Sequence, residues 1–155
     1  MKTAEILTLL QSKNRCLDRL MEATRTFLAA PLENLIVTDP AFEATTKTPL
    51  GTYEDDRLAV IRTLELHDRQ INTLITDLSS AEKTFAFMES VRVELLANER
   101  LIQSVLNADD MVFARIREAQ GQIGKLLHEN RKSGELLSKF KSGSTSTGEG
   151  MDKTL

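Results

Sequence analysis

Residues 79–141 have the sequence SSAEKTFAFMESVRVELLANERLIQSVLNADDMVFARIREAQGQIGKLLHENRKSGELLSKFK and contain no proline. Apolar side chains recur here every third or fourth residue, which is the period of one face of an α-helix. This spacing predicts one long buried stripe, which needs a partner surface from the same chain or from another. Its members are Ala81, Phe85, Met88, Val91, Leu95, Ile102, Val105, Leu106, Val112, Phe113, Ile116, Ile123, Leu126, Leu127, Leu137 and Phe140.

Helical spacing extends to the rest of the chain and predicts four helices. Their expected ranges are about 3–30, 53–78, 80–106 and 108–140. Thr52 and Asp55, and then Ser79 and Glu82, have the spacing of capping boxes, while Asn107–Asp110 resembles a further helix start. Because the apolar period continues across Ser79, one bent helix over 53–106 is the alternative.

Two segments lack this period. Residues 31–52 contain three prolines, a glycine and a threonine cluster, which predicts a loop. Residues 142–155 are small and polar, which predicts a disordered tail. We therefore expect a single domain over residues 1–141, an all-α bundle of three to four helices built around a long antiparallel helical hairpin of coiled-coil type.

The composition supports this fold class. The chain of 155 residues has no tryptophan, one tyrosine and seven glycines, which argues against a many-stranded sandwich or barrel. Its single cysteine, Cys16, allows no intrachain disulfide and fits a reducing compartment. With no signal-peptide pattern and no apolar run long enough for a membrane span, the expected location is the cytoplasm.

The net charge of −3 is unevenly distributed. Residues 31–110 carry seven basic and fifteen acidic side chains, whereas residues 111–141 carry seven basic and three acidic ones. Basic terminal helices beside an acidic central pair explain this pattern, and a basic last helix that meets an acidic partner is the alternative. The small basic excess does not indicate nucleic-acid binding.

The sequence shows no catalytic, cofactor-binding or metal-binding pattern. His67 and His128 lack the Glu-x-x-His spacing of metal sites in helix bundles. No glycine-rich phosphate loop or nucleophile elbow is present. Gly121 and Gly124 lie inside a predicted helix. The two explanations are close packing of this helix against another and a low helix stability that lets the segment rearrange on a partner. We expect a protein that is not an enzyme and needs no cofactor.

Two segments resemble flagellar export chaperones of the FlgN type. The first is Ile6–Leu10 with Leu17–Met21, and the second is the C-terminal stretch Leu126–Leu137, where Asn130 is followed by the pair Leu136 and Leu137. The usual second Asn of that stretch is missing here. The resemblance implies an all-helical cytoplasmic chaperone that binds an amphipathic helix of an export cargo, such as a hook-associated protein, and prevents its premature self-association.

In such a chaperone the last helix would carry the partner-binding stripe. We expect its residues to be Ile116, Ile123, Leu127, Leu137 and Phe140. Two alternatives stay open: these residues complete the bundle core, or the chain is a structural coiled-coil protein or adaptor that self-associates through the long stripe and has no client.

Overall fold

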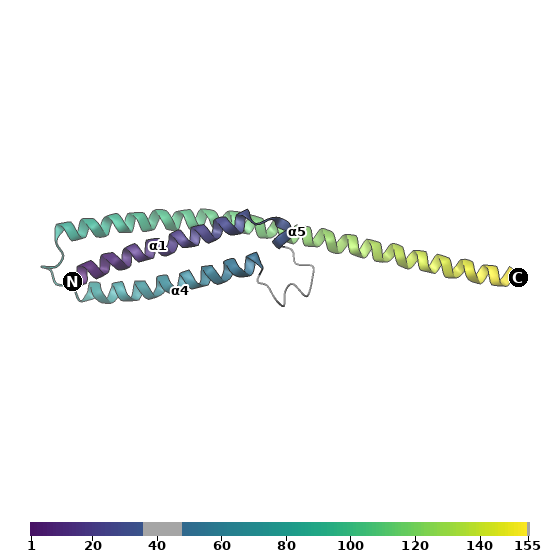
Figure 1. The fold of residues 1–155 in the computed structure, drawn as a ribbon, viewed down its shortest axis with the longest axis horizontal. Helices are drawn as coiled ribbons and strands as arrows, with labels where there is room; N and C mark the ends of the chain where they lie inside the picture. The colour runs from purple at the N-terminus through teal and green to yellow at the C-terminus, as the bar shows by residue number, and fades with distance from the viewer. Residues whose placement is uncertain (36–47, 155) are drawn as a thin grey trace. The chain divides into compact units, whose positions relative to one another are not determined.

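The computed structural model describes residues 1–35 and 48–154, with side chains as far as Phe140. Every element in these residues is a helix, and three of the helices are long (Figure 1). The prediction of an all-α helical bundle is confirmed. The helices are α1 (Lys2–Ala29), α2 (Leu32–Leu35), α4 (Pro49–Thr76) and α5 (Phe85–Thr154).

The chain forms two compact units. The first unit spans Met1–Arg115 and holds α1, α2, α4 and the first part of α5. The second spans Ile116–Leu155 and is the remainder of α5. Residues 142–154, expected as a tail, continue the backbone helix to Thr154.

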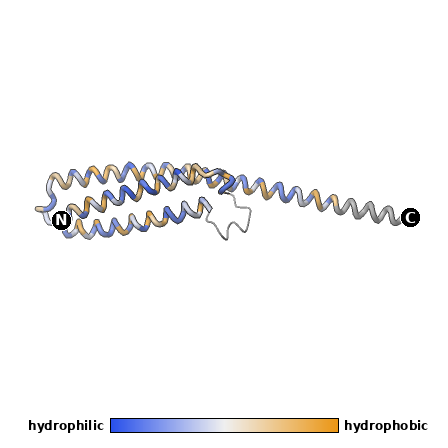
Figure 2. Tube along the Cα trace, viewed as in Figure 1, coloured by the Kyte–Doolittle hydropathy of each residue, from blue (hydrophilic) through white to orange (hydrophobic). Residues whose placement is uncertain are grey.

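The core of the first unit lies between α1, α4 and the first part of α5. One apolar cluster joins Ile6 and Leu10 of α1 to Ile71 of α4 and Phe87 of α5. Residue numbers in successive contacts rise together along α1 and α5 and fall along α4, so α4 is antiparallel to both, as in Figure 1. Orange and blue residues alternate along each of these helices in Figure 2, which is the pattern of amphipathic packing. The second cluster is made by Leu17, Leu20 and Val105.

Helix α4 begins earlier than predicted. Thr48, not Thr52, caps it, with its hydroxyl accepting a hydrogen bond of 3.0 Å from the Gly51 N–H. Pro49 occupies the first turn, where its missing N–H costs no helical hydrogen bond and its fixed φ suits the helix. The predicted loop is therefore shorter at this end, and its residues 36–47 lie outside the described part of the chain.

The break between α4 and α5 is real, so the single bent helix over 53–106 is wrong. Ser79 and Glu82 form the reciprocal hydrogen bonds of a capping box: the Ser79 N–H donates to the Glu82 carboxylate at 2.8 Å, and the Glu82 N–H donates to the Ser79 hydroxyl at 3.3 Å. This box shapes the loop, and α5 starts at Phe85 after Thr84, whose hydroxyl accepts from the Phe87 N–H.

The predicted break at Asn107–Asp110 is also wrong, because α5 runs through it. The side chains that suggested a cap have other partners. Asn107 accepts a hydrogen bond from Gln103 one turn earlier. Asp109 receives two from the guanidinium of Arg57, at 2.5 and 3.0 Å. A polar side chain that hydrogen-bonds to another side chain, on its own helix or on a neighbouring one, does not compete for the backbone hydrogen bonds and does not interrupt the helix.

The expected single buried stripe of α5 is two neighbouring stripes, of which one is buried. We call the first the buried seam, and all its members are buried or half-buried: Phe87, Val91, Glu94, Asn98, Leu101, Val105, Ala108 and Val112. The second, which we call the outer seam, lies one position further along the chain and is 44–59% exposed: Met88, Leu95, Ile102, Leu106 and Phe113. Phe85, also expected in the stripe, is 82% exposed.

Candidate protein-binding surface

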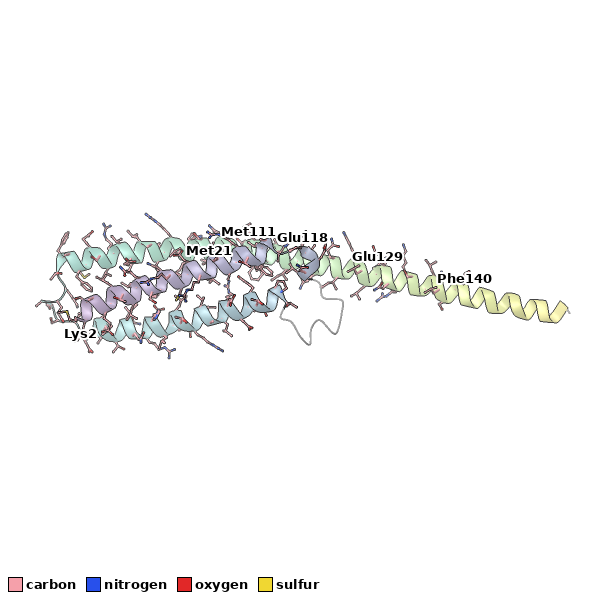
Figure 3. All side chains as sticks on the ribbon, viewed as in Figure 1. Lys2, Met21, Met111, Glu118, Glu129 and Phe140 are labelled. Atoms are coloured by element: carbon pink, nitrogen blue, oxygen red, sulfur yellow. The ribbon has the colours of Figure 1, made fainter. Side chains whose placement is uncertain are left out.

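The candidate surface is the apolar face of the second unit, and we call its five predicted residues the C-terminal stripe: Ile116, Ile123, Leu127, Leu137 and Phe140. Ile116 is half-buried. Ile123 is 40% exposed, and Leu127, Leu137 and Phe140 are 61–77% exposed. Figure 3 shows the labelled Phe140 side chain projecting from α5. Apolar side chains with this exposure are available to a partner.

The helical period brings part of the stripe onto one face. At about 100° per residue, Ile116, Ile123 and Leu127 lie within about 40° of one another around the helix axis. Leu137 lies about 60° from Ile116, and Phe140 about 120°. The first three residues therefore form a compact face, and the last two extend it around the helix.

Two further exposed apolar residues of this segment are outside the five predicted for partner binding: Leu126, which belongs to the predicted long stripe, and Leu136, which does not. Leu126 is 41% exposed and Leu136 is 64% exposed. Leu126 lies about 80° from Ile116 and about 20° from Leu137, so it widens the apolar face. The Leu126–Leu127 pair shows that the face is broader than one residue, whereas Leu136 lies about 160° from Ile116, on the other side of the helix.

The segment around the stripe is basic. Residues 116–140 contain three acidic side chains and five basic ones, which are Arg117, Lys125, Arg131, Lys132 and Lys139. Long basic side chains beside an apolar face favour a partner helix with an acidic flank, and their methylene stems can cover part of its apolar surface.

Three glycines of α5 lie among its described side chains. A Cβ atom built at Gly121, Gly124 or Gly134 would meet no neighbouring atom within 4 Å. The described chain therefore offers no packing neighbour at Gly121 or Gly124. Each lowers the intrinsic stability of the segment by about 1 kcal/mol relative to alanine.

The described side chains offer little else for chemistry. No group of three or more His, Cys, Asp or Glu residues among them could hold a metal ion. Cys16 is buried in α1, as a small hydrophobe would be. Nor does any helix in the described residues have the length and hydropathy of a membrane span.

A scan of family models finds no match to this chain, and searches of curated proteins and of solved structures find no similar protein. The geometry of the chain itself is therefore the basis for a functional proposal.

Proposed function

We infer that the protein binds an amphipathic helix of a protein partner along the C-terminal stripe. The observation that carries this inference is the exposure of Leu127, Leu137 and Phe140 on a basic helix of the second unit. A helical partner would place its apolar residues at positions i, i+3, i+4 and i+7 against such a face.

The most specific form of this proposal is a cytoplasmic export chaperone for a flagellar cargo, such as a hook-associated protein. Covering an amphipathic terminal helix of the cargo would suppress its self-association before export. Two features support it: the FlgN-like segments Ile6–Leu10 and Leu126–Leu137, and a binding segment that belongs to a different compact unit from residues 1–115.

The second candidate function is a structural coiled-coil protein or adaptor without a client. The outer seam of α5 favours it, because its five half-exposed apolar residues add a further helix-binding face to the first unit. In this case the apolar surface serves assembly of the chain itself or of a complex.

The test is the solution mass of the full chain, with and without a peptide of the C-terminal helix of a hook-associated protein from the same organism. A chaperone forms a complex of defined stoichiometry with the peptide. Ile123→Glu with Leu127→Glu abolishes this complex, because two charges enter the apolar face.

The matched control is Lys125→Glu. It changes the net charge by the same −2, but Lys125 lies about 160° from both Ile123 and Leu127 around the helix. Loss of the complex in this control, or no complex with the unmodified chain, would argue against the proposed function.

A further inference from the structure

The outer seam presents a helix-binding face on the first unit. Met88, Leu95 and Ile102 are spaced by seven residues, and Leu106 and Phe113 form a second seven-residue series four positions later. Alternating steps of this kind define the seam of a coiled coil. Its members are 44–59% exposed, so α1 and α4 leave room on this side of α5.

The same spacing recurs in the C-terminal stripe. Ile116, Ile123 and Leu137 continue the seven-residue series, with Asn130 between them, and Leu127 belongs to the second series with Gln120 and Gly134. The outer seam and the C-terminal stripe therefore have the same seven-residue spacing, which is the condition for two helices to pair along them.

We propose that residues 116–140 of one copy of the chain pack antiparallel along the outer seam, residues 88–113, of a second copy. In the best register, paired residue numbers add up to 229. Three layers are then apolar on both sides: Phe113 opposite Ile116, Leu106 opposite Ile123, and Ile102 opposite Leu127.

Polar seam residues match in the same register. Glu99 lies opposite Asn130, and Asp109 opposite Gln120. Sliding the pairing by one heptad in either direction places Glu99 against Ile123 or Leu137, which buries a carboxylate on an apolar residue. The register with paired numbers that add up to 229 is favoured by its three fully apolar layers, and it also places Arg92 opposite Leu137 and Leu95 opposite Gly134.

Charge complementarity favours this pairing. Residues 85–113 carry five acidic and two basic side chains, whereas residues 116–140 carry three acidic and five basic ones. In an antiparallel pair the residues that flank the seam face each other, and here Asp110 comes beside Arg117 of the second copy.

A hollow of about 400 Å³ on α5 provides an independent match. It is lined by Met88, Val91, Leu95 and Leu96 together with the charged residues Glu89, Arg92 and Glu99. In the proposed register Leu137 arrives opposite Arg92 and Phe140 opposite Glu89, and both Arg92 and Glu89 line this hollow. A cavity of this size accommodates an aromatic side chain.

The interface closes on two copies. The proposal includes that this pairing occurs twice, related by a two-fold axis, which gives a dimer rather than a filament. The dimer goes beyond the proposed function, and because it covers the C-terminal stripe, a client helix would compete with the second copy.

Solution mass and cross-linking of the full chain test this dimer. The expected mass is about twice the 17.3 kDa of the chain, and it falls to the monomer mass in Ile123→Glu with Leu127→Glu but not in Lys125→Glu. Circular dichroism confirms that the variants keep their helices. A monomer at all concentrations overturns the proposal.

Cysteine cross-linking tests the register. In a Cys16→Ala background, chains with Leu106→Cys are mixed with chains carrying Ile123→Cys and oxidised mildly. A disulfide-linked heterodimer is expected. The control mixture, Leu106→Cys with Leu137→Cys, is displaced by fourteen residues, or about 21 Å, and should not cross-link. Equal cross-linking of both mixtures, or of neither, overturns the proposal.

The two proposals fail independently. If the chain is a dimer that does not bind the client peptide, the chaperone proposal is contradicted and the dimer proposal stands. If the chain is a monomer that binds the peptide, the dimer proposal is contradicted and the chaperone proposal stands. Dissociation of the dimer by the peptide supports both.

Discussion

Between α1 and α5, Asn98 donates a side-chain hydrogen bond of 3.1 Å to the amide oxygen of Asn14. Both residues are only 9% exposed. The Asn14 amide donates in turn to the carboxylate of Glu94 at 2.9 Å, and that carboxylate also accepts from Gln11. A buried amide pair in a helical seam specifies the alignment of its helices, because any other alignment leaves it unsatisfied.

Asn98→Leu should destabilise the first unit by about 1–3 kcal/mol, since it leaves the buried Asn14 oxygen without its donor. Asn14→Leu combined with Asn98→Leu should recover part of this loss, because both polar groups are then removed. Urea denaturation measures both. Asn72→Leu, at an exposed site on α4, is the control and should change stability by about 0.5 kcal/mol or less. Strictly additive losses in the double variant would contradict the coupling.

Arg57 and Asp109 form the second polar contact at this scale. Their side chains are 33% and 17% exposed, and Arg57 also donates to the Tyr53 hydroxyl at 3.1 Å. Hydrogen bonding to Asp109 raises the pKa of the Arg57 guanidinium, so it stays charged at every accessible pH. Arg57→Ala should cost about 1.5–3 kcal/mol, and the exposed Arg62→Ala on the same helix much less. Equal melting temperatures for the two variants would refute this role.

Among the elements, the second part of α5 combines helical spacing with residues that weaken a helix. Gly121→Ala with Gly124→Ala should stabilise this segment by about 1 kcal/mol per substitution, since the added methyl groups meet no neighbour. On heating, the variant should keep more of its negative ellipticity at 222 nm than the unmodified chain does. The control is Gly51→Ala, where the added carbon lies 3.2 Å from the Thr48 hydroxyl and brings no such gain.

The loop between α4 and α5 should make a small pH-dependent contribution. The Ser79 N–H and hydroxyl hydrogen-bond the Glu82 carboxylate and lower its pKa. A carboxyl group with a lowered folded-state pKa stabilises the fold above its ordinary pKa, and this contribution is lost as the pH falls below about 5. The melting temperatures of the unmodified chain and Glu82→Gln should therefore differ most near neutral pH and converge in acid. A difference independent of pH would contradict this account.

For the whole molecule, the division after Arg115 predicts that the first unit folds without the second. A chain ending at Arg115 keeps both apolar clusters, the Asn14–Asn98 contact and the Arg57–Asp109 pair. It should unfold cooperatively, with a melting temperature close to that of the full chain measured as a monomer. Loss of cooperative unfolding would show that residues 116–155 complete the core, which is the alternative in which the C-terminal stripe is structural.

The sequence by itself determined the all-α class, the extents of α1 and α4 to within a few residues, and the turn at Ser79–Glu82, because helical spacing and capping depend on neighbouring residues. It also indicated an apolar face on residues 116–140. Only the tertiary structure decided which of two adjacent α5 seams is buried, since both have the same period and the positions of α1 and α4 make the choice. It likewise decided that Asp109 is no helix cap, because its partner Arg57 is 52 residues away in the chain.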